Sequence, residues 1–193
     1  MPVQPSGADD REHRVRTTTL EAFADTILPG AKRSADDPAV AGVAADAGSV
    51  EAGAIELLEW SATGVHDGLD FFATTLNERA AERAAERGTG LDPSVPAFAA
   101  LDHADRRALV AELTSPGHPE KEFWVSLALF CNMAFDSAAH LHTAEAIAAG
   151  HPGLAAMGIS NPDADGLWRF PAYSYGRKLA EPHPDTTPSG SPA

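Results

Sequence analysis

Apolar residues dominate one stretch of the chain, which runs from Phe123 to Phe135 and contains only two polar residues. Pro119 precedes this stretch and Gly150 follows it at a distance, as is typical of the start and the end of a helix. The pattern therefore predicts one long helix over about residues 119–149. Because a helix that is apolar on every side must be surrounded by protein, we expect this helix to lie buried at the centre of the fold.

Three amphipathic patterns come before this helix and predict further helices. Thr18 and Glu21 have the spacing of a capping box, and Asp102 is a good N-cap for the third pattern. Gly64 and Gly68 interrupt the second pattern and indicate either a kink or a close helix contact. The expected ranges of the three helices are 18–28, 49–87 and 102–113.

The domain organisation follows from where these patterns start and stop. Residues 1–16 are polar and predict a disordered lead, and residues 181–193 are rich in Pro, Ser and Thr and predict a disordered tail. Residues 17–180 are expected to form a single helical domain. No segment alternates as a strand would, so we predict an all-α bundle with an ordered, irregular C-terminal arm that begins after Gly150.

The charge balance narrows the possible partners. The chain has 28 acidic and 14 basic residues, a net charge of −14, which repels phosphate backbones and argues against a nucleic-acid partner. The apolar run is shorter than a membrane span and ends at Asp136, so no membrane span is expected. No apolar stretch precedes Leu20, which predicts a cytoplasmic protein without a signal peptide.

Asp136 and His140 are the weak catalytic candidates of the sequence. If one helix contains both residues, their spacing of four places a carboxylate and an imidazole on one face, where they could share a proton. His142 would lie on the other side of such a helix. The chain has no recognisable spacing for a third metal ligand, so no metal site is predicted. The alternative is a polar cluster capped by the C-terminal arm.

The C-terminal arm contains the strongest candidate for a protein-binding surface. Its residues 168–178 combine aromatic and basic side chains, which are the types that dominate protein interfaces. The alternative is that the arm folds back on its own helices. The candidate partner-binding residues are Trp168, Arg169, Phe170, Tyr173, Tyr175 and Arg177.

Motifs that bind cofactors are absent from the sequence. There is no glycine-rich dinucleotide loop after a strand, no phosphate-binding loop and no nucleophile elbow. We therefore predict a chain with no cofactor of its own.

The stretch from Thr19 to Gly30, TLEAFADTILPG, resembles the start of the gluconate 2-dehydrogenase subunit 3 family. The small residues 38–43 and the apolar helix from Phe123 are in keeping with that family. The ending PAYSYGRK, residues 171–178, is similar to that of a related group of uncharacterised bacterial proteins.

The resemblance implies a small non-catalytic subunit that binds and stabilises a flavin-dependent oxidoreductase of the glucose–methanol–choline type. FAD would then be carried by the large subunit of that partner. Exported members carry a twin-arginine signal, from which Arg14-Val-Arg16 departs. Two alternatives stay open: a stand-alone enzyme that uses Asp136 and His140, and a helical protein that binds an apolar metabolite.

Overall fold

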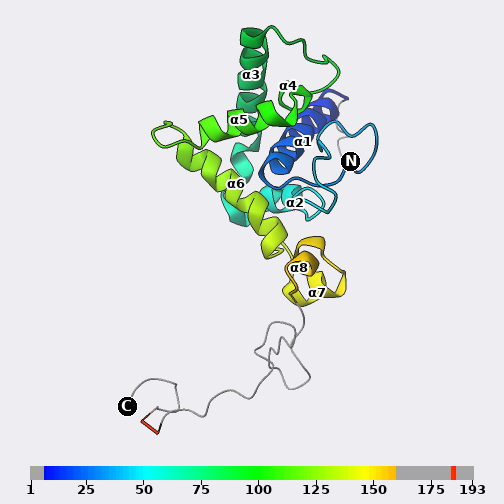
Figure 1. Cartoon of the computed structure of the whole chain (residues 1–193), viewed down its shortest axis with the longest axis vertical. Coiled ribbons are helices and arrows are strands. Elements are labelled where there is room, and N and C mark those ends of the chain that lie inside the picture. The colour runs from blue at the N-terminus through cyan, green and yellow to red at the C-terminus, as the bar shows by residue number, and fades with distance from the viewer. Residues whose placement is uncertain (1–6, 160–183, 186–193) are drawn as a thin grey trace, which may run out of the picture. The chain divides into compact units, whose positions relative to one another are not determined.

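The computed structural model describes residues 7–159 and 184–185. The chain divides after Ser160 into two units, and the helices belong to the first. All regular elements among the described residues are helices, so the predicted all-α fold is confirmed. In chain order (Figure 1) the α-helices and the 3-10 helices η1 and η2 are α1 (Gly7–Ile27), α2 (Ala54–Glu59), η1 (Ser61–Thr63), η2 (His66–Gly68), α3 (Leu69–Arg87), α4 (Ala97–Ala100), α5 (His103–Leu113), α6 (Lys121–Asp136), α7 (Thr143–Ala148) and α8 (Pro152–Ala156).

Trp124 of α6 is the centre of the main core. Its side chain is fully buried, and its ring centroid lies 5.2 Å from that of Phe72 on α3 and 6.3 Å from that of Phe23 on α1. Edge-to-face and tilted ring pairs at such distances add to the stabilisation that comes from burial alone. The prediction that this apolar helix supplies the centre of the fold is therefore confirmed for one of its faces.

The predicted single helix over 119–149 is wrong, because the structure divides it into α6 and α7. α6 ends at Asp136, and Ala138 then takes a left-handed backbone conformation with φ of 48°. The sequence contains neither Gly nor Pro at this turn to predict the break. The turn brings Ala138 into a small apolar cluster with Ala146 of α7 and Leu154 of α8, and this burial favours the break over a continuous helix.

The expectation that this helix is enclosed on all sides is also wrong. Phe123, Val125 and Leu129 of α6 are 61%, 37% and 54% exposed. A helix of 16 residues that packs through one stripe leaves its other residues in solvent, whatever their polarity. In the part of the chain that the structure describes, no helix combines the length and apolar character needed to cross a membrane.

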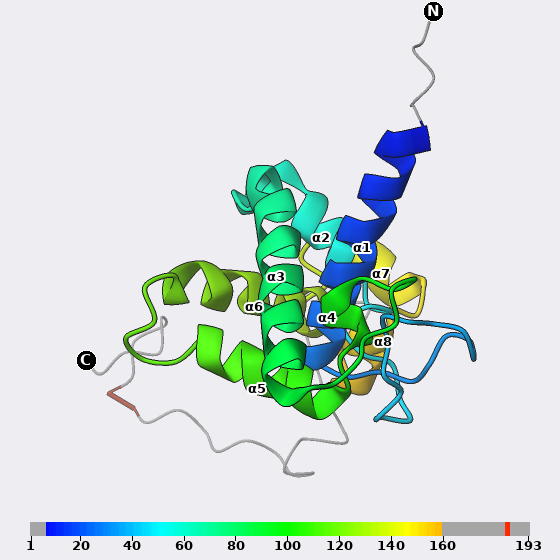
Figure 2. The ribbon, with the colours of Figure 1, turned by 90° about the horizontal axis from the view of Figure 1, so that it is seen from above.

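The start of the fold lies earlier than predicted. α1 begins at Gly7, so residues 7–16, predicted as part of a disordered lead, are helical, and Thr18 lies within the helix instead of capping it. Arg16, the last residue of this extension, pairs through its guanidinium with the carboxylate of Glu59 at 2.8 Å. Figure 2 shows the amino-terminal turns of α1 leading away from the other helices.

The second predicted helix is interrupted between its two halves. α2 ends at Glu59, two short 3-10 turns follow, and α3 begins directly after Gly68. The interruption at Gly64 and Gly68 agrees with the kink that these glycines predict. The predicted start at Ser49 is wrong, because Ser49 is buried and its N–H donates to the carbonyl oxygen of Leu28 at 3.0 Å. Residues 49–53 form turns, and α2 starts after Gly53.

The helix predicted behind Asp102 is confirmed as α5. The Asp102 carboxylate accepts a hydrogen bond from the backbone N–H of Asp105 at 2.8 Å, as an N-cap does. Both residues lie within four positions of each other, so this feature depends on local sequence alone.

A buried polar clasp joins α1, the connection after it and α5. Asp25 is fully buried, and its carboxylate accepts hydrogen bonds from the backbone N–H groups of Gly30 and Ala41 at 3.1 and 2.8 Å. The guanidinium of Arg106 lies 3.9 Å from this carboxylate. Arg106 also donates to the carbonyl oxygens of Pro38, Ala39, Ala99 and Leu101. The clasp therefore fixes a long connection that has almost no regular structure of its own.

Candidate functional site

Asp136 and His140 are not brought onto one helix face. Asp136 is the last residue of α6 and is exposed, while His140 lies in the turn between α6 and α7. His142 is the N-cap residue of α7 and is also exposed. The spacing argument for a shared proton required one helix through both candidates, and α6 ends too early for that.

His140 instead packs against the chain that precedes α2. A side chain at Gly53 would overlap the Nε2 atom of the His140 ring, so glycine is needed for this approach. The Nδ1 atom of His140 is buried and has no hydrogen-bond partner in the described part of the chain. Burial lowers the pKa of His140, the charge of Glu56 opposes this shift, and His151 adds to it.

His151 is the neighbour of His140 that the sequence did not single out. The two ring centroids lie 6.3 Å apart. His151 caps the amino-terminal end of α8, because its Nδ1 atom accepts the backbone N–H of Leu154 at 3.3 Å. Its Nε2 atom lies 3.0 Å from the carbonyl oxygen of Ala52, ahead of α2. A histidine between Gly150 and Pro152 indicates only a turn in the sequence, so no local signal could have revealed this contact.

The chemistry available at this junction is limited to protons. The imidazoles of His140 and His151 lie side by side, and the exposed carboxylate of Glu56 acts on His140. No three His, Cys, Asp or Glu side chains in the described ranges are arranged to hold a metal ion. Cys131 lies in the core, where burial raises the pKa of its thiol to about 12 and leaves little nucleophilic thiolate.

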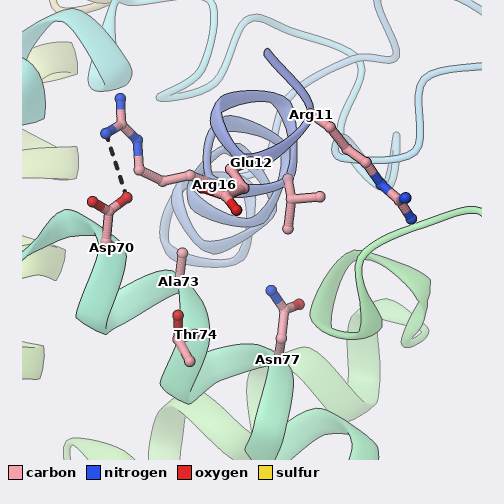
Figure 3. Close-up of a pocket in the computed structure, with 8 residues that line it drawn as sticks. Arg11, Glu12, Arg16, Asp70, Ala73, Thr74 and Asn77 are labelled. Carbon is pink, nitrogen blue, oxygen red and sulfur yellow. Dashed lines mark hydrogen bonds and ion pairs between the residues drawn. The ribbon is translucent and has the colours of Figure 1, made fainter. Parts of the chain in front are cut away.

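A second candidate is an open groove between α1 and α3, which no sequence argument predicted. Its volume is about 870 Å³, and four residues from each helix line it. Figure 3 shows Arg16 and Arg11 extending to opposite sides of α1, with Thr74 and Asn77 of α3 facing the space below them.

The polar residues of this groove hold the two helices together. Arg16 pairs with Glu59 at 2.8 Å and with Asp70 at 3.5 Å. Asn77 donates to the hydroxyl of Thr19 at 2.9 Å and accepts the backbone N–H of Phe98 at 3.0 Å. Because these groups are already engaged with one another, the groove contains a structural network instead of a catalytic pair.

A third feature is apolar and lies on α6. We call Val125 and Leu129 the α6 apolar surface; Phe123 is also exposed but lies about 120° round the helix from Leu129. Val125 and Leu129 are one helical turn apart and point outward together. On the opposite face, Trp124 and Leu127 are fully buried, which fixes the helix rigidly beneath the exposed residues. The sequence identified this run as apolar but could not tell its exposed face from its buried face, since both are equally hydrophobic.

The predicted partner-binding residues of the C-terminal arm lie outside the described residues. These are Trp168, Arg169, Phe170, Tyr173, Tyr175 and Arg177. Their role stays a prediction.

The alternative of an apolar metabolite requires a cavity between helices. The small cavity beside Asp25 measures about 10 Å³, which is close to the space of a single water molecule. Its lining includes the charged side chains of Asp25, Arg33 and Glu51. This cavity does not suit an apolar ligand.

Comparison with known proteins gives a family and no assigned activity. No curated protein and no solved structure matches the chain. A family model matches residues 14–193, which is nearly the whole sequence. The chain therefore belongs to DUF5987, a family of unknown function.

Proposed function

We propose that this protein is a non-catalytic accessory subunit that binds and stabilises a flavin-dependent oxidoreductase of the glucose–methanol–choline type. FAD is carried by that partner, and this chain contributes a rigid docking surface. The α6 apolar surface is the observation that carries the proposal.

This surface has the properties of a protein-binding site. Contiguous apolar groups exposed on a monomer mark sites of interaction with other proteins. Val125 is 37% exposed and Leu129 is 54% exposed, although the chain is strongly acidic, with a net charge of −14. The helix beneath them is anchored by Trp124, so binding requires little ordering of the surface.

The class of partner comes from the resemblance of residues 19–30 to the gluconate 2-dehydrogenase subunit 3 family. Within this stretch, Asp25 supports the connection that leads to Gly30, so the resembling residues maintain the fold. A shared fold is compatible with a shared mode of assembly, and it supplies no catalytic residue.

The experiment first reads the genes adjacent to the one for this protein and then co-expresses it with any flavin-dependent oxidoreductase that they encode. Size-exclusion chromatography with detection of flavin absorbance should give a single peak that contains both chains. Removal of this protein should lower the thermal stability of the flavoenzyme. If the two chains never co-elute and the flavoenzyme is fully stable and active alone, the proposal is wrong.

A matched pair of variants tests the docking surface itself. The double variant Val125→Asp, Leu129→Asp should abolish co-elution, because two buried carboxylates without partners oppose association. Val43→Asp provides the control, since Val43 is 56% exposed and lies outside α6. If the wild type, the double variant and Val43→Asp bind equally well, the interface does not include the α6 apolar surface.

A further inference from the structure

A groove between α1 and the loop ahead of α4 differs in charge from the chain as a whole. Its volume is about 460 Å³. The chain has 28 acidic and 14 basic residues, yet no carboxylate lines this groove among the described residues. Its lining comes from α1, from the connection after α1 and from the loop ahead of α4: Arg11, Arg14, Val15, Thr18, Pro38, Pro93, Ser94, Val95 and Pro96. The groove is therefore positive in a protein that is strongly negative.

The two arginines of this groove are free to contact a ligand. Arg11 and Arg14 are exposed, and in the part of the chain that the structure describes neither guanidinium has a hydrogen bond or an ion pair. Figure 3 shows Arg11 extending to the side of α1 away from Arg16. Most other arginines pair with carboxylates: Arg16, Arg33, Arg79, Arg83, Arg87 and Arg106. An unpaired guanidinium can form charge-assisted hydrogen bonds with a partner without first breaking others.

The carboxylates that are near this groove in the sequence do not neutralise it. Asp37 is buried in an ion pair of its own. Asp92 accepts hydrogen bonds from the backbone N–H and the hydroxyl of Ser94 at 2.8 and 2.6 Å. Asp10 and Glu12 share α1 with the arginines, but neither lines the groove, and Glu12 lines the one between α1 and α3. The positive charge of the two arginines is therefore not cancelled within the groove.

The apolar part of the lining favours a peptide over a small anion. Arg11, Arg14 and Thr18 follow at spacings of three and four residues, so they share one face of α1 over about 10 Å. Val15, which is 39% exposed, lies beside them, and the rest of the lining includes three prolines and Val95. The backbone and aliphatic groups of an extended segment would cover these residues, whereas inorganic phosphate would leave them in water.

The proline-containing side of the groove is held in place before a partner binds. The carbonyl oxygen of Pro38 accepts a hydrogen bond from Arg106 at 3.1 Å. The loop ahead of α4 is anchored where the N–H of Phe98 donates to the side chain of Asn77 at 3.0 Å. Proline side chains lose almost no rotamer freedom on burial. Binding therefore requires little ordering of this side.

We propose that this groove binds an extended acidic segment of a partner protein, with two Asp or Glu side chains of that segment on Arg11 and Arg14. Alternate side chains of an extended chain lie about 7 Å apart on one side, within reach of two arginines one helical turn apart. The remaining surface repels such a segment, because the net charge is −14, so the groove determines where the segment docks. The groove and the α6 apolar surface share no residue, and this inference does not depend on the proposed oxidoreductase partner.

The test is an NMR titration of the full-length, ¹⁵N-labelled protein with a seven-residue peptide of alternating glutamate and valine. The backbone amides of Thr18 and Val95 should shift with a dissociation constant below about 1 mM, and those of α6 should not. A matched peptide with glutamine in place of glutamate should not bind. Affinity for the glutamate peptide should fall as salt is added. Absence of shifts at Thr18 and Val95, or equal binding of the two peptides, would overturn the proposal.

Matched double variants separate the groove from a general attraction between charges. Arg11→Gln, Arg14→Gln should weaken binding of the glutamate peptide about tenfold or more, because two charge-assisted contacts are lost. Arg107→Gln, Lys121→Gln removes two other cations without ion pairs in the described residues and should bind as the wild type does. Both variants should keep the melting temperature of the wild type. Equal loss of binding in both would overturn the proposal.

Two further measurements exclude the other occupants of the groove. Size-exclusion chromatography should give the same elution volume for the wild type and for Arg11→Gln, Arg14→Gln. A wild-type dimer that this variant fails to form would assign the groove to a second copy of the chain. Inorganic phosphate should displace the peptide only at concentrations far above those of the peptide, and displacement at equal concentration would assign the groove to simple anions. Either of these results would contradict an acidic peptide as the occupant.

Discussion

The carboxylate of Asp25 lies 3.9 Å from the guanidinium of Arg106, and both side chains are buried. Asp25 lies in the last turn of α1, whereas Arg106 lies in the first turns of α5. Buried charges persist in proteins when they are paired and their remaining hydrogen-bonding groups are satisfied. Here backbone N–H groups donate hydrogen bonds to the carboxylate of Asp25, and backbone carbonyl oxygens accept hydrogen bonds from the guanidinium of Arg106.

Loss of this clasp should be among the most damaging single changes. Arg106→Met removes the charge that faces Asp25 and leaves several buried carbonyl oxygens without a donor. The expected loss of unfolding free energy is about 3–5 kcal/mol, measured by urea denaturation and circular dichroism. Arg107→Met is the control, because Arg107 is exposed and its loss should change stability by no more than about 0.5 kcal/mol. Equal effects of the two changes would contradict a role for the clasp.

The second prediction concerns Gly48, whose backbone lies close to that of residues 28–30. A Cβ atom on Gly48 would lie 2.5 Å from the carbonyl oxygen of Leu28 and 2.6 Å from the nitrogen of Gly30. Gly48→Ala should therefore cost about 1–3 kcal/mol of stability, seen as a lower melting temperature. Gly90→Ala meets nothing within 4 Å and should be tolerated. A tolerated Gly48→Ala would show that the connection can move apart.

Two leucines of α6 distinguish its buried face from its exposed face. Leu127→Ala should cost about 2–5 kcal/mol, because the side chain is fully buried and leaves a cavity. Leu129→Ala should cost no more than about 0.5 kcal/mol, because the side chain is more than half exposed. Urea titrations of both variants provide the measurement. Similar losses for the two leucines would mean that the outward face of α6 is covered.

The single thiol should be unreactive in the native protein. Burial raises the pKa of Cys131 to about 12, so at neutral pH almost no thiolate is present and the sulfur is inaccessible. A chromogenic disulfide reagent should detect no thiol in buffer and one thiol per chain in urea. A rapid reaction of the Cys131 thiol in buffer without urea would contradict this prediction and show that α6 readily detaches from the core.

Local features of the fold could be predicted from the sequence, and long-range ones could not. The Asp102 cap and α5 follow from residues within one turn, and the sequence correctly assigns them. The end of α6 at Asp136 has no such local cause, because it results from the burial of Ala138 with Leu154 of α8. A continuous helix is the better local choice for this stretch, and the tertiary contact overrides it.

The candidate site illustrates the same limit. Asp136 and His140 have a spacing that is meaningful only within one helix, and the turn at Ala138 separates them. His151, which lies beside His140, has no sequence pattern that links it to the chain ahead of α2. The exposure of Leu129 could not be predicted either, because hydrophobicity alone does not show whether another part of the chain will cover a residue.

The position of Arg106 in the sequence also determines when this part of the fold can form during synthesis on the ribosome. The carbonyl oxygen of Ala39 receives its donor from a residue 67 positions later in the chain. Chains emerge amino terminus first, and contacts between distant segments form only after both have been synthesised. The connection that follows α1 therefore cannot make its hydrogen bonds to Arg106 until α5 has left the exit tunnel.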